Sequence, residues 1–327
     1  MELSSSDPRP IAIVLGASHW HAPLYLDGLA RRFRVMAVQD ADPEAARAFA
    51  APLGAHIAES VDDALNEDRI DIAFVFSPHH EMLAVSRKLI NRGIPFVIEK
   101  PAGKNLAELN EIAAESRRAG VAVTVPLVQR DAPTDVWLRK AGHIVYERMA
   151  FITGPPDRYR RNGNSWMLEP ALSGGGSLMN LGAHFVDLAV RHLGNPSEIV
   201  RKQSTTLHGT AVDDHATMIL TTDAGHEAII EVGYSFPDSP LKRYCSFTAA
   251  GTKGFASIDT AGSALFTDND GTTTTATINV DSDPLYEAFV DAVADTLATR
   301  FAGLTTLAEL ATTMEIIWSP TSDTGGM

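Results

Sequence analysis

A lysine follows a short apolar run in the stretch Pro95 to Pro101, which reads Pro-Phe-Val-Ile-Glu-Lys-Pro. The run from Phe96 to Ile98 is typical of a buried parallel strand, so Lys100 is expected at the carboxyl end of that strand. In open α/β sheets this edge is where ligands bind, and an amine there could reach a bound substrate. Taken alone, Glu99 and Lys100 are more simply a surface ion pair in a solvated turn.

A second group of polar residues lies in the segment from Ser177 to Leu193, which is expected to be one helix. Three glycines, at 174–176, come just before it and would let the chain pass close to another backbone or to a ligand. The polar residues recur at helical spacing and so form one stripe along the helix, made of Asn180, His184, Asp187 and Arg191. This stripe could be only the solvent-exposed side of a surface helix.

The first half of the chain alternates apolar strands with helices of roughly a dozen residues, which predicts βαβ units and a parallel sheet. We therefore expect a doubly wound, dinucleotide-binding α/β domain over residues 1–125. The expected strands are 11–15, 35–38, 55–58, 70–76, 95–98 and 121–125. The expected helices are 23–33, 43–51, a short one after Ser60, 81–92 and 105–119.

The turn after the first strand should bind phosphate at the N-terminus of the following helix. The usual fingerprint G-x-G-x-x-G would place glycines at 16, 18 and 21, whereas this chain has Gly16, Ser18 and His21. Ser18 is small enough for a pyrophosphate to approach the backbone. His21 must change how helix and strand pack, so the turn alone is weak evidence for a dinucleotide.

Asp40 ends the second strand, about 20 residues beyond the glycine turn. An acidic residue there can accept hydrogen bonds from the ribose hydroxyls and would repel a 2′-phosphate. Ala41 offers no basic side chain for that phosphate, so NAD is expected over NADP. The alternative is that Asp40 is only a turn residue in Asp-Ala-Asp-Pro.

After residue 125 the alternation stops, and residues 126–327 are expected to form a second, α+β domain. The region 198–280 is rich in Thr, Val and Ile with turn residues between, which predicts successive antiparallel strands. Residues 154–173 show no periodicity and are expected to be a long loop. Trp166, Tyr159 and Arg160 in it would suit a polyhydroxylated substrate, although a solvated excursion with one anchoring Trp fits the pattern equally.

The composition is that of a globular, acidic protein. The formal net charge of −14 argues against nucleic acid or an anionic membrane as a partner, because both need clustered Lys and Arg. No apolar run approaches the roughly 18 residues of a membrane span, and the N-terminus lacks the regions of a signal peptide. A single cysteine, Cys245, excludes an internal disulfide and fits a reducing compartment. We expect a cytoplasmic protein.

The glycine turn, Asp40, the Glu99-Lys100-Pro101 stretch and the segment that begins at the three glycines follow one another in an order that resembles the Gfo/Idh/MocA family of oxidoreductases. This family contains the relatives of glucose–fructose oxidoreductase and inositol dehydrogenase. The resemblance spans about residues 10–318. It implies an N-terminal Rossmann domain, a C-terminal domain on a large, mostly antiparallel sheet that commonly forms the dimer surface, and a tightly bound NAD(P). The matching stretches are 14–18, 38–40, Phe76-Ser-Pro78, Val97-Ile-Glu-Lys-Pro101, Gln129-Arg130 and 174–187.

The resemblance also implies the roles of the polar residues. Lys100 would approach the substrate hydroxyl beside the nicotinamide, and His184 would act with it in proton transfer. Asn180 stands where many members carry an aspartate. An amide can orient a hydroxyl but cannot take its proton, so the base role would fall to His184 or Lys100.

The expected contacts follow from these positions. The substrate is expected to contact Lys100, Arg130, Trp166, Asn180 and His184. The cofactor is expected to contact Gly16, Ser18, His19, Trp20, Asp40, Ser77, His80, Glu99, Lys100 and Gln129.

Four histidines, at 19, 21, 79 and 80, fall in two turns at the same edge of the expected sheet. Clustered imidazoles could bind zinc, but no cysteine or evident carboxylate ligand joins them. Hydrogen bonds to the phosphate or ribose of a cofactor, or to the substrate, are the preferred interpretation, plain packing is the alternative, and no metal site is expected.

The leading hypothesis is an NAD-dependent dehydrogenase of a sugar, polyol or related hydroxy compound, working as a homo-oligomer through the C-terminal sheet. A non-catalytic NAD- and sugar-binding regulator is the alternative from another class, because Asn180 and the altered glycine turn leave room for it. An isomerising enzyme that recycles its bound NAD is the third possibility.

Overall fold

The structure, a computed structural model, describes residues 7–205 and 207–319. The chain divides into two compact units. Of the described residues, the first comprises those up to Pro126 together with Asn162–Asn164 and Asp283–Glu309. The second comprises those in Leu127–Arg161, in Ser165–Ser282 and from Leu310 on. The division at residue 125 into two continuous domains stays a prediction.

The first unit is built on a six-stranded sheet in the order β3-β2-β1-β4-β5-β6, and all five neighbouring pairs are parallel. Its strands are β1 (Ile11–Leu15), β2 (Arg34–Gln39), β3 (His56–Ala58), β4 (Ile72–Val75), β5 (Phe96–Ile98) and β6 (Val123–Thr124). The strand order reverses between β1 and β4, and ligands of such sheets bind at this switch point. The predicted doubly wound, Rossmann-type sheet is confirmed.

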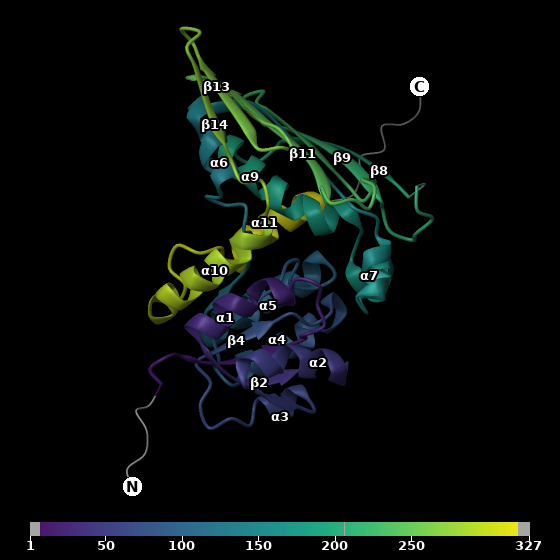
Figure 1. Cartoon of the computed structure of the whole chain (residues 1–327), viewed down its shortest axis with the longest axis vertical. Coiled ribbons are helices and arrows are strands. Elements are labelled where there is room, and N and C mark those ends of the chain that lie inside the picture. Colours follow the sequence, from purple (N-terminus) through teal and green to yellow (C-terminus); the bar gives the residue numbers. More distant parts are fainter. Residues whose placement is uncertain (1–6, 206, 320–327) are drawn as a thin grey trace. The chain divides into compact units, whose positions relative to one another are not determined.

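Helices connect these strands, as Figure 1 shows in its purple and blue part. They are α1 (Leu26–Arg32), α2 (Pro43–Ala50), α3 (Val61–Ala64), α4 (Met82–Asn91) and α5 (Leu106–Ala119), with short 3-10 turns η1 (Ala22–Tyr25), η2 (Ala51–Leu53) and η3 (His79–Glu81). Local chemistry sets the ends of α5. The Asn105 side chain accepts a hydrogen bond from the Glu108 amide at 2.9 Å, and Gly120 ends the helix at φ 67°.

Helix α10 (Asp283–Thr296), which the 3-10 turn η7 (Leu297–Thr299) follows, also belongs to the first unit, far from its other helices in sequence. It packs against α1 where Gly28 leaves room for Val290, because a Cβ at Gly28 would lie 2.8 Å from the Val290 side chain. Arg31 of α1 also pairs with Glu287 and Asp291. A segment near the C-terminus is therefore part of the dinucleotide-type unit.

The second unit is built on an eight-stranded sheet in the order β14-β13-β12-β11-β7-β10-β9-β8. Its strands are β7 (Ile144–Thr153), β8 (Glu198–Ser204), β9 (His215–Thr221), β10 (Glu227–Gly233), β11 (Arg243–Gly251), β12 (Gly254–Ile258), β13 (Ser263–Asp268) and β14 (Thr273–Thr277). The expected mostly antiparallel sheet is confirmed. The expected simple succession of strands is wrong at one place, because β7 inserts between β10 and β11 and pairs with β10 in parallel.

Helices α6 (Pro133–Leu138) and α9 (Ala183–Leu193) pack against this sheet, α6 on β11 and β12 and α9 on β7 and β10 (Figure 1). The other helices of the unit are α7 (Asp157–Arg161), α8 (Pro170–Ser173) and most of α11 (Leu307–Trp318), with the 3-10 turns η4 (Arg139–Ala141) and η5 (Ser165–Leu168) and the π turn η6 (Leu178–Gly182). Phe185 of α9 packs against Phe151 and Phe247 from two central strands, with its ring centroid 5.3 and 5.8 Å from theirs. This aromatic contact joins α9 to the sheet.

Within the part of the chain that the structure describes, no helix has both the length and the apolar content to cross a membrane. The cytoplasmic location stays a prediction.

A buried ionic cluster ties α6, β7 and α9 together. The His192 imidazole lies between two carboxylates, 2.8 Å from Asp135 and 2.7 Å from Glu147. Burial opposes the charged imidazole, but hydrogen bonds to the two carboxylates outweigh it and raise the pKa of His192 to about 9. His192 is therefore charged at neutral pH.

This cluster predicts a loss of stability at alkaline pH. The pKa of His192 is higher in the folded chain than the ordinary 6.5, so its contribution is complete below pH 6.5 and is lost as pH rises through about 9. At ~1.4 kcal/mol per pKa unit, the contribution at low pH is about 3 kcal/mol. Urea unfolding of the wild type and of His192→Gln should differ most at pH 6 and least at pH 10. An equal difference at both pH values would contradict the assignment.

Candidate active site

Gly16 begins the turn at the carboxyl end of β1, where the chain comes very close to the end of β4. Its φ is 90°, and a Cβ there would lie 2.6 Å from the carbonyl carbon of Phe76. Both the backbone conformation and the contact require glycine. Gly16 therefore fills the first position of the fingerprint for the reason that the fingerprint requires a glycine there, which is a tight turn after the strand.

Asp40 closes this turn onto the end of β2. One carboxylate oxygen accepts a hydrogen bond from the Ser18 amide at 2.7 Å, and the other accepts one from the Asp42 amide at 2.7 Å. Each carboxylate oxygen has a second lone pair, so Asp40 keeps the capacity to accept ribose hydroxyls. Its role in cofactor choice stays a prediction.

Asn164 was not predicted for the site, yet it belongs to this turn. Its amide nitrogen donates to the carbonyl oxygens of Ser18 and Asn162, at 2.9 and 2.7 Å, and the side chain is buried. No local pattern marks it, because an asparagine in a polar stretch is ordinary and its partner Ser18 lies 146 residues earlier.

Three buried polar atoms near the carboxyl edge of this sheet have no hydrogen-bond partner among residues 7–205 and 207–319. They are Nδ1 of His80, Oε2 of Glu99 and Oδ1 of Asn164. Buried polar atoms in native proteins are nearly always paired, so these atoms indicate a bound group with its own donors and acceptors. A dinucleotide, with ribose hydroxyls and a carboxamide, has that chemistry, and the turn that begins at Gly16 is the place where this fold binds one.

Lys100 lies at the end of β5 and is 2% exposed. Burial disfavours the charged amine and lowers its pKa to about 8, although the negative charge of Glu99 opposes the shift. An amine with this pKa exchanges protons readily near neutral pH, as a general acid or base must. The alternative of a solvated surface ion pair is wrong, because both side chains are buried.

Histidines 19, 21 and 79 lie at the same edge and are buried. Burial keeps the pKa of His19 well below 6.5, so its imidazole is neutral. The Nδ1 atom of His19 accepts a hydrogen bond from the His21 amide at 3.1 Å. Among the described residues, no group of three His, Cys, Asp or Glu side chains is arranged to hold a metal ion.

In the second unit, Asp213 holds the glycine-rich segment that precedes the predicted helix. One of its carboxylate oxygens accepts from the Gly176 amide and the Gln203 side chain, both at 3.0 Å. The other accepts from the Ser177 hydroxyl at 2.7 Å and the Leu178 amide at 2.9 Å. A Cβ at Gly176 would lie 2.6 Å from the Asp213 amide nitrogen, so the close approach requires glycine.

The helix predicted from Ser177 to Leu193 is not one continuous α-helix. Residues Leu178–Gly182 form a π turn, and α9 begins at Ala183. Asn180 and His184 are therefore not separated by one regular α-helical turn, and the stripe predicted from α-helical spacing is interrupted between them. Single π turns inside helices occur frequently at functional sites.

Asn180 is fixed by two tyrosines. Its amide nitrogen donates to the hydroxyl oxygens of Tyr159 and Tyr234, at 2.7 and 3.1 Å. Both amide hydrogens are thus used, and the group that Asn180 presents elsewhere is its carbonyl oxygen, an acceptor. The Arg158 guanidinium lies over both tyrosine rings, 5.0 and 5.5 Å from their centroids, and donates to the Tyr159 hydroxyl at 3.1 Å.

The segment 154–173 is not the irregular loop expected. It contains α7, η5 and α8, and Tyr159 in it is fully buried. Sequence periodicity missed these elements because each has only four or five residues. Trp166 lies in η5.

Arg130 makes a two-point ion pair with Asp187 of α9, from its Nε at 2.7 Å and from a terminal nitrogen at 2.5 Å. This contact connects the Gln129-Arg130 segment to α9 within the second unit. The predicted substrate contact of Arg130 stays a prediction, as does the cofactor contact of Gln129, which is buried.

The structure thus places the predicted residues in two groups, each within its own unit. The first unit holds Gly16, Ser18, His19, Trp20, Asp40, Ser77, His80, Glu99 and Lys100 at or beside the carboxyl edge of its sheet. The second unit holds Gln129, Arg130, Trp166, Asn180 and His184. Their individual roles stay predictions.

A parallel sheet with a glycine turn beside its switch point defines a dinucleotide-binding α/β protein. Residues 13–127 match the sequence model described as "Oxidoreductase family, NAD-binding Rossmann fold". Residues 139–257 match the one described as "GFO/IDH/MocA C-terminal domain". The chain belongs to the Gfo/Idh/MocA family of oxidoreductases, which confirms the resemblance seen in the sequence.

Curated relatives match this chain over part of its length. A putative UDP-kanosamine synthase oxidoreductase subunit of Amycolatopsis mediterranei is 29% identical over 167 residues, covering 50% of this chain and 45% of the relative. D-apiose dehydrogenase of Paraburkholderia graminis is 25% identical over 237 residues, covering 67% and 57%. The chain thus spans about half the length of these relatives.

Solved structures share the fold over almost the whole chain. GenD2 from gentamicin A biosynthesis, in complex with NAD, has a TM-score of 0.78 at 19% identity and covers 97% of this chain and 95% of its own. The WlbA dehydrogenase from Bordetella pertussis, in complex with NADH and UDP-GlcNAcA, has a TM-score of 0.79 at 19% identity, covering 96% and 95%. At these identities the likeness shows the fold alone.

Proposed function

We propose that the protein is an NAD-dependent dehydrogenase that transfers a hydride between the nicotinamide and a CH–OH group of a sugar, polyol or related compound. The observation that carries the proposal is the buried Lys100 at the ligand-binding edge of the parallel sheet, with its pKa lowered to about 8. Relatives named D-apiose dehydrogenase and inositol 2-dehydrogenase 1 support a polyhydroxylated substrate.

In this proposal Lys100 takes the proton of the substrate hydroxyl as the alcohol is oxidised, and returns it in the reverse direction. His184 serves the same proton transfer. Asn180 accepts a hydrogen bond through its carbonyl oxygen, because both of its amide hydrogens are donated to tyrosines. The bound nicotinamide supplies the hydride chemistry.

NAD is proposed over NADP because of Asp40. Its carboxylate ends β2 and faces the glycine turn through the Ser18 amide. A carboxylate at this place accepts ribose hydroxyls and repels a 2′-phosphate. Ser18, His19 and Trp20 of the turn, with Ser77 and His80 after β4, are proposed to line the same cofactor site.

The direct test is reduction of NAD and of NADP, followed by nicotinamide absorbance, with a panel of sugars, inositols, sugar acids and nucleotide sugars. The proposal expects turnover with at least one of them and a preference for NAD. Tight NAD binding with no turnover on any member would instead support a regulator. A bound nicotinamide that is reduced and reoxidised within one turnover, with a sugar product formed, would support an isomerising enzyme.

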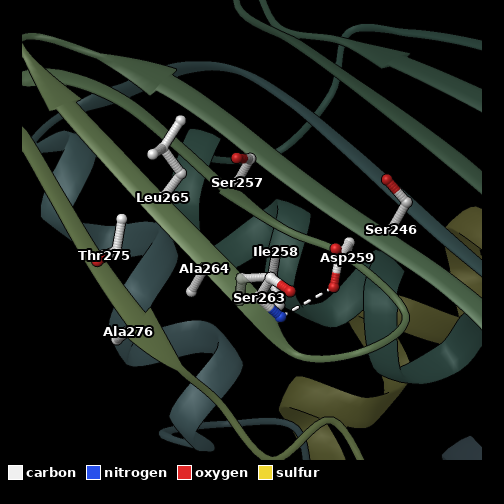
Figure 2. A pocket seen from close by; sticks show the side chains of 9 residues that line it. All are labelled: Ser246, Ser257, Ile258, Asp259, Ser263, Ala264, Leu265, Thr275 and Ala276. Atoms are coloured by element: carbon white, nitrogen blue, oxygen red, sulfur yellow. Dashed lines mark hydrogen bonds between the residues drawn. The ribbon is translucent and has the colours of Figure 1, made fainter.

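We also propose that the protein self-associates through the exposed face of the eight-stranded sheet. Tyr244, Phe255 and Leu265 are 40–42% exposed on neighbouring strands β11, β12 and β13. A hollow of about 380 Å³ lies in this region. Figure 2 shows the side chains that line it, which are serines, a threonine, Asp259 and apolar residues that include Leu265. Exposed aromatic and aliphatic side chains on adjacent strands are typical of interfaces. Sedimentation equilibrium should give a mass above 35.1 kDa, and a monomer at micromolar concentration would exclude the proposal.

A further inference from the structure

His21 occupies the position where the dinucleotide fingerprint has its third glycine. That glycine ordinarily allows close packing of helix and strand. Here the imidazole is 2% exposed and lies against the Trp20 ring, with centroids 3.7 Å apart. The chain therefore places a buried, titratable, hydrogen-bonding ring where the fold needs only space, and packing alone does not explain this choice.

The ring makes a hydrogen bond through each nitrogen. Nδ1 lies 3.1 Å from Oε1 of Glu99, and Nε2 lies 3.2 Å from the Tyr286 hydroxyl of α10. A carboxylate is only an acceptor, so Nδ1 carries the hydrogen and donates to Glu99. In the neutral imidazole Nε2 then accepts from the Tyr286 hydroxyl, which fixes the tautomer.

Glu99 is held at one oxygen. Its Oε1 accepts from the Tyr25 hydroxyl at 2.7 Å as well as from His21, and the side chain is fully buried. Its Oε2 is buried and has no hydrogen-bond partner among the described residues. Two donors from the first turn and η1 therefore set the orientation of a buried carboxylate, while the charge on the second oxygen is not shared with a donor.

We propose that His21 is a positioning residue for Lys100: it holds the Glu99 carboxylate in place and thereby fixes the charge next to the catalytic amine. The inference rests on the proposed role of Lys100. It assigns a function to a departure from the family's fingerprint, and to the contact that Tyr286 of α10 makes with this departure.

The pKa of Lys100 depends on where the Glu99 carboxylate lies, so a measured pKa reports whether His21 holds that carboxylate in place. Burial lowers the pKa of Lys100 to about 8, and Glu99 raises it. The other titratable groups around this cluster come from the first turn, η1, η3 and α10. They are His19, which is neutral, His21, Tyr25 and Tyr286, which are hydrogen-bonded in place, and His79, which is buried.

The test measures the pKa of Lys100 directly, in the full chain and without substrate. The chain has seven lysines, so ¹³Cε-lysine labelling gives few NMR signals, and Lys100→Arg identifies the one from Lys100. In His21→Ala we expect the pKa of Lys100 to rise by about one unit, because water enters and the released carboxylate can approach the amine. In Glu99→Gln the pKa should fall below that of the wild type, because the opposing charge is gone.

His21→Asn is the matched control, since its amide can still donate to Glu99 from the Nδ1 position. We expect its Lys100 pKa to stay within a few tenths of a unit of the wild type. If His21→Ala does not fold, His21→Leu replaces it: leucine fills much of the space of the imidazole but cannot donate to Glu99, so the pKa of Lys100 should again rise.

An unchanged Lys100 pKa in the folded His21→Ala variant, or in His21→Leu where that replaces it, would overturn the inference. Equal shifts in His21→Ala and His21→Asn would do so as well, because a packing role alone predicts them. The NMR titration needs no turnover, so a failure of the proposed dehydrogenase activity would be seen separately, in the substrate panel.

Discussion

Lys100→Ala is expected to lower kcat by a hundredfold or more while NAD binding and folding persist. General acid–base help from a positioned group contributes about 10²–10⁴-fold, and Lys100 is the buried amine at the ligand-binding edge of the sheet. The side chain lies at the end of β5, after the last residue that pairs in the sheet, so its truncation should leave the sheet intact. Single-turnover reduction of NAD, with NAD affinity measured by calorimetry, separates the chemical step from binding.

The pH dependence gives the same residue an independent signature. For oxidation of an alcohol the amine must be deprotonated, so kcat of the wild type should rise with pH through about 8, where Lys100 titrates. In Lys100→Ala this rise should be absent. Lys104→Ala is the matched control, because Lys104 is a half-buried lysine four residues further along the chain, paired with Glu108 on α5. Near-normal turnover in Lys100→Ala would exclude the mechanism.

The first sheet was readable from the sequence because its strands are apolar on both faces. All four residues of β4 and all three of β5 are buried, and such strands appear as continuous apolar runs between turn residues. Once the strands alternate with helices, the rule for parallel sheets places their carboxyl ends at one edge. Gly16 and Lys100 could therefore be assigned to a site without knowing any distance.

The residues that were missed have partners far away in the chain. Asn164 bonds Ser18 across 146 residues, and Tyr286 bonds His21 across 265. No local periodicity reports such contacts. The π turn at Leu178–Gly182 was missed for a different reason. Such turns are rare, and the spacing of the polar side chains in this segment suits an ordinary helix.

Asp213→Asn is expected to be the most damaging conservative change in the second unit. Each oxygen of the Asp213 carboxylate accepts one backbone amide, from Gly176 or from Leu178, together with one side-chain donor. Whichever way an asparagine turns, its NH₂ group faces one of these amides, and a backbone N–H cannot turn away as a hydroxyl can. Leaving a buried donor unpaired costs about 1–3 kcal/mol, and charge-assisted bonds are lost as well. We expect unfolding to become easier by about 3 kcal/mol.

The hydrogen bonds of Asp213 are also expected to position a residue of the proposed active site, so a loss of stability is only half of the expected effect. The segment that Asp213 holds leads directly into the π turn that carries Asn180, and a misplacement of about 1 Å can cost a hundredfold in rate. In folded Asp213→Asn protein we therefore expect kcat to fall at least tenfold.

Ser177→Ala is the graded control, because it removes one donor and leaves Asp213 with its backbone partners; it should cost about 1 kcal/mol. Asp214→Asn is the positional control, because this buried neighbour accepts from the amides of Leu207 and His208 instead. It should lose stability with kcat nearly retained, and equal losses of kcat in both aspartate variants would show that Asp213 acts through general stability alone.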